Sequence, residues 1–384
     1  MKTGFKASGP ALHPSLACLP LSSYFYPVQP TTTHNRSAFL RRLLRNRGAG
    51  FGMVVIAAAF LSALFAYALA PDHTPDANRI LVELAARKPG FRQQFYLQPK
   101  PGTTPAGNWL QGRRDAVTYI PVQSWARQGD NLLLQRYVDE GVTESLLVPL
   151  HGQEPAALLT HKTFWLGTDK FGRDILSRLL IGTRVSLGVG AVAVLLSLTI
   201  GIFLGALAGY YRGRTDALVM WLVNVVWSMP TLLLVFGITL ALGKGYWQVF
   251  FAVGLTLWVN VARLVRGQVL ALRELSYVEA ARAMGFSQAR IIIRHILPNI
   301  LGPVLVIAAG NFATAIVIEA GLSFLGLGVQ PPQPSWGLMM KEHYNFIITN
   351  NPVLALAPGL AIMLLVLAFN LLGNGLRDAL DVRG

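Results

Sequence analysis

The sequence has little cysteine and little charge. Its single cysteine, Cys18, excludes an intrachain disulfide framework and any zinc site built from several cysteines. Charged residues make up only 13% of the 384 residues, whereas soluble domains carry about 25%. At the same time, 53% of the residues are hydrophobic, and disorder requires low hydrophobicity with high charge. The composition therefore excludes both an ordinary soluble enzyme and a disordered chain.

Several catalytic signatures are also absent. The sequence contains no G-x-x-x-x-G-K-[ST] phosphate loop, so it cannot hydrolyse ATP by that route. It contains neither an H-E-x-x-H zinc signature nor a G-x-S-x-G nucleophile turn. His151 and His161 share one segment without the spacing of a helical metal site. We therefore expect no enzymatic activity, and no cofactor or metal held by this chain.

Long hydrophobic runs are what the sequence does contain. A bilayer core is crossed by about 20 mostly apolar residues in a helix. Six windows meet this criterion, and only one of them contains an acid, Glu319. The windows are 51–70, 185–209, 217–243, 245–262, 299–320 and 352–376. This pattern predicts an all-α membrane protein with six transmembrane helices, of which the third contains Pro230.

The net charge of +15 is unevenly distributed along the chain. A basic surplus of this size often indicates nucleic-acid binding. If the N-terminus is inside, however, the inner segments are 1–50, 210–216, 263–298 and 377–384, with 17 basic and five acidic residues. Cytoplasmic loops of membrane proteins carry this excess. We therefore predict cytoplasmic N- and C-termini and no nucleic-acid partner.

Composition also divides the chain into segments. The first 37 residues are rich in Pro, Ser and Thr and predict a disordered extension. Residues 38–70 combine a basic, amphipathic surface helix with the first span. Residues 71–163 are polar and proline-rich, which predicts an external insert between the first and second transmembrane helices. Within it, 80–88 is a candidate helix, and 115–122 and 132–137 are candidate strands.

The longest internal loop, 263–298, contains a compact motif. Glu279-Ala280-Ala281-Arg282-Ala283-Met284-Gly285 is typical of a short helix that ends in a glycine turn, because glycine accepts a positive φ. The small alanines allow another surface to approach closely. Pro298 is expected to begin the next span. The motif therefore predicts a docking element rather than a catalytic site.

At these residues the chain resembles a known family. The segment is similar to the EAA loop of bacterial ABC importer permeases, whose pattern is E-A-A-x3-G-x9-I-x-L-P. The matching residues are Glu279, Ala280, Ala281, Gly285, Leu297 and Pro298. The isoleucine of the pattern is replaced by His295.

Further motifs resemble oligopeptide and dipeptide permeases of the C type. Residues 166–178 are similar to their L-G-T-D-x-x-G-R-D-x-L-S-R stretch, in which Thr168 or Asp169 is a candidate cap of an interfacial helix. Residues 321–337 are similar to the segment that precedes their last span, and 321–328 is expected to be a glycine-rich re-entrant turn. Residues 376–381 are similar to their tail. The 1–37 extension and the 71–163 insert exceed the usual pattern.

The resemblance implies a type I ABC importer fold and a function. The core at 164–376 would form half of the translocation pore for di- or oligopeptides in the bacterial inner membrane, ending in a cytoplasmic tail at 377–384. The implied partners are a second homologous permease, two cytoplasmic ATPases that bind ATP and Mg, an extracytoplasmic substrate-binding protein and membrane lipid. The residues implied to dock the ATPase are Glu279, Ala280, Ala281, Arg282, Met284, Gly285, Leu297 and Pro298.

One alternative function is a structural or sensory membrane protein that uses the insert as a receptor. The other is a secondary transporter or channel driven by an ion gradient. Such proteins carry several intramembrane acids or a pair of repeats with broken helices. Glu319 is the one acid within the six windows, near the outer end of its span. A capped or paired residue at a helix end is the simpler interpretation of it.

Overall fold

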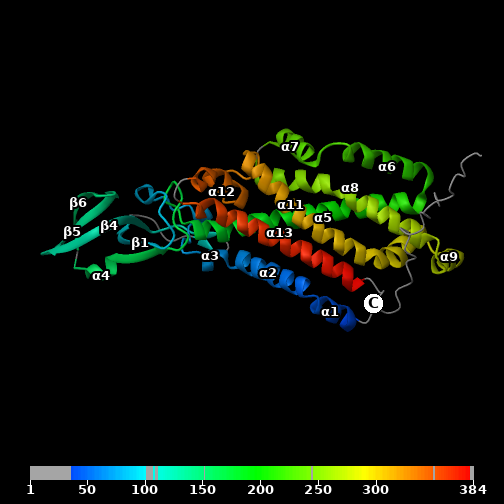
Figure 1. The fold of residues 1–384 in the computed structure, drawn as a ribbon, viewed down its shortest axis with the longest axis horizontal. Helices are drawn as coiled ribbons and strands as arrows, with labels where there is room; N and C mark the ends of the chain where they lie inside the picture. Colours follow the sequence, from blue (N-terminus) through cyan, green and yellow to red (C-terminus); the bar gives the residue numbers. More distant parts are fainter. Residues whose placement is uncertain are drawn as a thin grey trace, which may run out of the picture.

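A long helical bundle carries a small β-sheet at one end (Figure 1). The computed structural model describes residues 36–100, 107–108, 111–150, 152–243, 245–348 and 351–380. Cys18, His151 and most of the predicted disordered extension lie outside the described residues.

Five helical runs are long and apolar enough to cross a membrane. They are α2 (Arg47–Leu64), α5 (Ile175–Tyr211), α8 (Tyr246–Arg273), the run Gln288–Leu325 and α13 (Val353–Leu380). The fourth run contains α10 (Gln288–Ile291), a π-turn (Ile292–Ile296), a 3-10 turn (Leu297–Ile300) and α11 (Leu301–Leu325). These runs coincide with five of the six predicted windows and confirm the all-α membrane fold class.

The sixth window, 217–243, is not one continuous helix. It forms α6 (Gly213–Trp227) and α7 (Thr231–Leu242), whose axes differ by 91°. Pro230 has no N–H to donate and disfavours helical backbone at the residue before it. The third predicted span is therefore broken at Pro230, and the predicted total of six holds if this bent pair counts as one span.

Glycines bring α5 and α8 into close contact. Gly201, Gly205 and Gly209 are spaced four residues apart on α5. A Cβ atom on Gly205 would lie 2.5 Å from the carbonyl oxygen of Ala262, and one on Gly209 would lie 2.8 Å from that of Arg266. In lipid, the hydrophobic effect does not drive helices together. Small residues instead let two helices approach closely and gain van der Waals contact. This glycine stripe therefore fixes the distance between the two helices.

An antiparallel five-stranded sheet in the order β6-β5-β4-β1-β7 occupies the far end of the bundle (Figure 1). Its strands are β1 (Phe91–Pro99), β4 (Val117–Gln128), β5 (Asn131–Asp139), β6 (Val142–Pro149) and β7 (Leu159–Phe164). The short strands β2 (Gly107–Asn108) and β3 (Gly112–Arg113) pair separately, and α4 (Pro155–Leu158) precedes β7. Gly129 and Gly141 supply the positive φ angles of the two-residue hairpin turns.

The insert is thus more β-rich than its sequence suggests. The strands expected at 115–122 and 132–137 are confirmed as β4 and β5. The helix expected at 80–88 is wrong, because only one 3-10 turn, Val82–Leu84, forms there. Leu81 and Leu84 instead anchor an extended segment in a cluster with Phe95 and Phe164.

The other end of the bundle gathers α1 (Arg36–Arg45), α9 (Ser276–Ala283) and the C-terminal end of α13 (Figure 1). The helix α1 lies within the stretch where a surface helix is expected. At the sheet end, α3 (Ala66–Leu69) follows α2, and α12 (Trp336–His343) precedes α13. The sheet and α9 therefore lie at opposite ends of the molecule.

The glycine stripe predicts a specific stability defect. In Gly205→Leu, the added side chain meets the backbone of α8, and overpacking of this kind costs about 1–3 kcal/mol. We expect a lower apparent melting temperature of the detergent-purified protein. Gly237→Ala in α7 is the control, because a Cβ there meets no described atom within 4 Å. Equal melting temperatures for the two variants would contradict the close contact.

Candidate functional site

The helix α9 presents two different faces. Glu279, Ala280 and Met284, which follows its last residue, are exposed. Val278 and Ala281 are buried at 0% and 1% exposure in a cluster with Ile291 of α10. The exposed face is thus free for a partner, whereas the buried face fixes α9 to the bundle.

The turn after α9 explains the spacing of the motif. The N–H of Gly285 donates to the Arg282 carbonyl at 3.0 Å, and the N–H of Phe286 donates to the Ala281 carbonyl at 3.2 Å. This pair of bonds is a Schellman motif, which requires a left-handed residue at the glycine position. Gly285 has a φ of +76°. The expected order of helix, glycine turn and helix is therefore confirmed.

Ala281 differs from its predicted position. It had been placed with Ala280 on the docking surface, but its side chain packs beneath the turn. A Schellman motif commonly brings the residue three before the cap against the residue after the glycine. The small side chain at 281 therefore serves the turn and the inner packing, and Ala280 remains on the outer face.

The rest of the motif lies on the long helix that follows. Leu297 is half-buried and Pro298 is exposed, both within the run Gln288–Leu325. Pro298 does not begin this helix, which corrects the prediction. Its missing N–H is accommodated by the π-turn Ile292–Ile296 and the 3-10 turn Leu297–Ile300.

His295, the departure from the family pattern, also has a packing role. Its ring stacks on Phe286 with centroids 5.7 Å apart. Arg282 is exposed, and its guanidinium lies 6.0 Å from the Tyr210 ring centroid. The motif is thus held from both sides by aromatic contacts.

Ion pairs link the helices that precede α9. Arg266 of α8 binds Asp216 of α6 in a bidentate manner, with its Nη2 at 2.6 Å from Oδ2. Arg212 pairs with Glu274, immediately after α8. Bidentate geometry of this kind adds orientation as well as energy. The two pairs therefore join α6 to α8, and the end of α5 to the residue after α8.

The second motif, 166–174, forms a tight turn at the opposite end. A Cβ on Gly172 would lie 1.7 Å from the Leu81 carbonyl oxygen, and Gly172 has a φ of +73°. The Thr168 hydroxyl accepts from the N–H of Arg87 at 2.9 Å. The turn therefore binds the segment that leads into the β-sheet.

Neither Thr168 nor Asp169 caps a helix, contrary to expectation. Asp174 is the N-cap of α5, and its Oδ2 accepts from the N–H of Ser177 at 2.8 Å. The interfacial helix expected here is continuous with the second span as the 37-residue helix α5. Asp169 instead closes the turn by accepting from the N–H groups of Phe171 and Arg173 at 2.8 and 2.9 Å.

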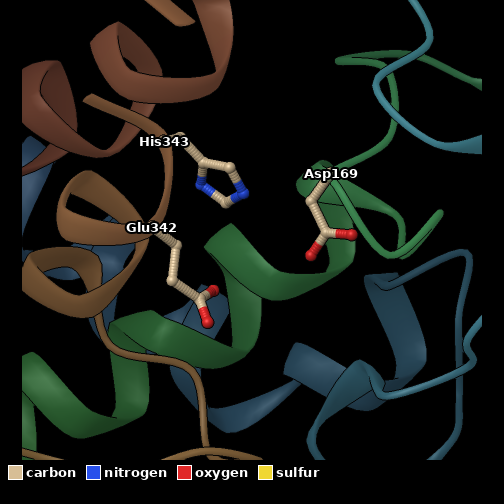
Figure 2. A group of neighbouring side chains, drawn as sticks. All are labelled: Asp169, Glu342 and His343. Carbon is tan, nitrogen blue, oxygen red and sulfur yellow. The ribbon is translucent and has the colours of Figure 1, made fainter. Parts of the chain in front are cut away.

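Two acids and a histidine converge beside this turn (Figure 2). Asp169 comes from the turn, and Glu342 and His343 come from α12; their ligand atoms lie within 4.8 Å of one another. Such donors suit a divalent cation, but Arg173 already bridges both acids. Its Nε lies 2.5 Å from Asp169 Oδ2, and its Nη2 lies 3.1 Å from Glu342 Oε2. The arrangement is therefore an ion-pair network centred on Arg173.

His343 is a fully buried neighbour of this network. Its Nδ1 lies 2.7 Å from the Met339 carbonyl oxygen, so we assign the proton to Nδ1. Burial lowers the pKa of His343, which keeps the ring neutral. Sequence reasoning missed Glu342 and His343, because no spacing rule brings residue 342 next to residue 169.

The third motif is helical for longer than expected. Residues 321–325 continue α11, which ends at Gly326 with a φ of +84°. Glu319 is fully buried and accepts from the Ser323 hydroxyl at 2.7 Å. That hydroxyl also accepts from the N–H of Val329 at 3.2 Å. Glu319 thus organises the turn after its helix.

Comparison with known proteins gives consistent matches. Residues 201–383 match the family of binding-protein-dependent transport system inner membrane components. Residues 36–88 match the N-terminal TM domain of oligopeptide transport permease C.

Three relatives are matched by this chain over more than two thirds of their own length. The glutathione transport system permease protein GsiD of Pectobacterium atrosepticum is 46% identical over 217 residues, which cover 56% of this chain and 72% of the relative. The dipeptide transport system permease protein DppC of Alkalihalophilus pseudofirmus is 45% identical, covering 56% and 71%. The oligopeptide transport system permease protein OppC of Bacillus subtilis is 41% identical, covering 57% and 72%.

The ion-pair network predicts a strong stability effect of Arg173→Gln. Removing one member of a buried ion pair costs about 3–5 kcal/mol, because the remaining charges lose their partner. We expect an apparent melting temperature lower by roughly 5–15 °C in detergent. Arg92→Gln, at an exposed position on β1, should leave it unchanged. A small effect of Arg173→Gln would indicate that water solvates the two acids.

Proposed function

Because the chain belongs to the family of binding-protein-dependent transport system inner membrane components, we propose that it forms half of the pore of an ATP-driven importer for di- or oligopeptides. The family consists of multi-pass transport subunits rather than enzymes. Because the family is named for binding-protein-dependent transport, the alternative of a secondary transporter is not retained.

The peptide substrate rests on the relatives. GsiD, DppC and OppC are named for glutathione, dipeptide and oligopeptide transport. All three substrates are short peptides, and this shared chemistry is what we transfer to the present chain. ATP and Mg would be bound by the partner ATPases.

The exposed face of α9 is the observation that carries the proposed coupling. A short helix with an acid, a small residue and a flexible apolar side chain suits a groove on a partner protein. Glu279 would meet a basic group of the ATPase, Ala280 would allow close approach, and Met284, 65% exposed, would adapt to the groove. Gly285 would hold the turn in shape.

The packing of α9 supports the direction of force transmission. Because Val278 and Ala281 are buried against the long helix from Gln288 to Leu325, a push on α9 would be passed to that helix. The ion pairs of Arg266 and Arg212 would pass it to α6 and the inner end of α5. ATP-driven closure of the ATPases would in this way switch the pore between its inward- and outward-facing forms.

The orientation follows from charge and from the position of α9. We place α1, α9 and the end of α13 in the cytoplasm, where the basic segments favour them. The sheet would then lie outside, where it would contact the substrate-binding protein or the second permease. Residues Val142 and Leu147 of β6 are 54% and 53% exposed, which gives that edge an apolar surface for such a contact.

Reversal of charge on α9 should uncouple transport. In Glu279→Lys, like charges would face each other across the ATPase interface, and this costs several kcal/mol. We expect at least a tenfold loss of ATPase co-purification and of peptide uptake by cells, with normal membrane insertion. Glu154→Lys, exposed before α4 at the opposite end, is the matched control. Normal uptake and normal co-purification in Glu279→Lys would reject the docking role.

The turn after α9 allows a second test of the docking role, in which two substitutions at Gly285 strain the backbone to different degrees. At Gly285 a Cβ meets no described atom within 4 Å, so backbone strain alone decides the effect. Gly285→Val forces a β-branched residue into left-handed backbone, at about 1–3 kcal/mol. Gly285→Asn is better tolerated there, and should couple more efficiently than valine in the same uptake assay. Equal activity of both variants would contradict a role for this backbone conformation.

The orientation is tested with reporter fusions. A reporter enzyme active only outside the cytoplasm should be active when inserted at the Gly141 hairpin turn, because such exposed turns tolerate insertions. The same reporter should be inactive at the C-terminus. Activity at the C-terminus would reverse the proposed topology.

A further inference from the structure

A cavity of about 320 Å³ lies where the β-sheet meets the membrane helices. Pro71 follows α3 on one side, and Asp174 begins α5 on the other. The edge strand β7 contributes His161, Lys162 and Thr163. The remaining lining residues are Asp72, Arg79, Phe164 and Trp165. The cavity is large enough for a small ligand.

Arg79 and Asp72 already neutralise each other. The Arg79 guanidinium lies 2.6 Å from Asp115 Oδ2 and 3.3 Å from Asp72 Oδ1. Asp72 also accepts from the N–H groups of Thr74 and Arg79. These charged groups therefore form part of the cavity wall, and few of their donors and acceptors remain for a hydrogen bond to a ligand.

Lys162 is different, because the charges of Asp72, Asp115 and Asp174 act on its ammonium only from a distance. No ion pair joins it to any acid in the part of the chain that the structure describes; its Nζ lies 4.3 Å from the Tyr119 ring centroid. Burial and the nearby Arg79 lower the pKa of Lys162 to about 8. An ammonium carries three donors, so this half-buried group has capacity for an acidic ligand.

Asp174 supplies the opposite charge in the same wall. Its Oδ2 is used by the helix cap, but its Oδ1 is buried and has no donor among the described residues. Burial raises the pKa of Asp174, in spite of the bonds from Ser177. One cavity thus contains an ammonium and a carboxylate oxygen that attract each other at a distance. Neither is used in a direct ion pair among the described residues.

We propose that this cavity binds a zwitterion, with its acidic group against Lys162 and its ammonium group against Asp174. Two kinds of molecule have this chemistry: the headgroup of phosphatidylethanolamine, and a free amino acid or short peptide. The cavity lies at the outer ends of α3 and α5, where lipid headgroups lie in the proposed orientation. Trp165 at its rim is 63% exposed, and tryptophan is enriched at membrane interfaces. The headgroup is therefore the favoured ligand.

The experiment compares two lysines that both lie over aromatic rings. Lys162→Met removes the ammonium from the cavity, and Lys170→Met removes an exposed one 5.0 Å from the Phe171 ring centroid. Each full-length variant is purified in detergent and titrated with phosphatidylethanolamine, phosphatidylcholine or phosphatidylglycerol. Bound lipid is counted by native mass spectrometry. A second titration follows alanine and dialanine by calorimetry in lipid-free detergent.

We expect phosphatidylethanolamine to bind the wild type and Lys170→Met equally, and Lys162→Met at least tenfold more weakly. Phosphatidylcholine, whose quaternary ammonium donates no hydrogen bond, and phosphatidylglycerol, which has no cation, should bind at least fivefold more weakly than phosphatidylethanolamine. Because the folded protein lowers the pKa of Lys162, its charged form opposes folding below that pKa. Lys162→Met should thus keep or raise the melting temperature, and lost binding cannot be ascribed to unfolding.

The outcomes separate the two ligand sources. Loss of alanine or dialanine binding in Lys162→Met, with unchanged lipid binding, would support a free zwitterion and overturn the headgroup assignment. Equal binding of all ligands to Lys162→Met and Lys170→Met would overturn the site itself. Neither outcome depends on peptide transport or on coupling to an ATPase.

Discussion

Three glycines on α5, spaced four residues apart, allow its backbone to lie against that of α8, and this contact connects the two ends of the molecule. The outer end of α5 begins at Asp174, in the turn that holds the β-sheet segment. The inner end of α8 leads into α9. Because the contact is made by backbone rather than by long side chains, the two helices cannot slide without losing it. The turn at 166–174 and α9 are therefore attached to one rigid pair of helices.

Because the α5–α8 pair is rigid, any change of conformation must occur at other junctions between helices. The π-turn before Pro298 interrupts the regular hydrogen bonding of the long helix close to α9. The 91° bend between α6 and α7 is a second interruption, at Pro230, which has no N–H to donate. In the proposed coupling, a force applied at α9 would therefore meet a stiff α5–α8 pair and two irregular junctions. Displacement would concentrate at those junctions.

The sequence predicted the features that depend on local chemistry. Hydrophobic length identified the membrane helices, and Gly285 identified the left-handed turn because few other residues adopt it. Ala281 was placed on the wrong face, since an alanine is small whether it faces a partner or packs beneath a turn. Glu342 and His343 were missed because only the folded chain brings α12 to the turn at Asp169. Most strands of the insert were missed because their hydrophobic alternation is weak.

The basic surplus has different consequences at the two ends of the molecule. In the part that we place outside, two arginines pair with acids: Arg79 with Asp72 and Asp115, and Arg173 with Asp169 and Glu342. An unmatched positive surplus there would oppose the proposed orientation. At the inner end, the exposed arginines of α1 and α10 contribute charge that holds the termini on their side. Lys162 departs from this pattern, since it is a half-buried cation that forms no direct ion pair with an acid among the described residues. A ligand that brings its own acidic group to the cavity would supply that pair.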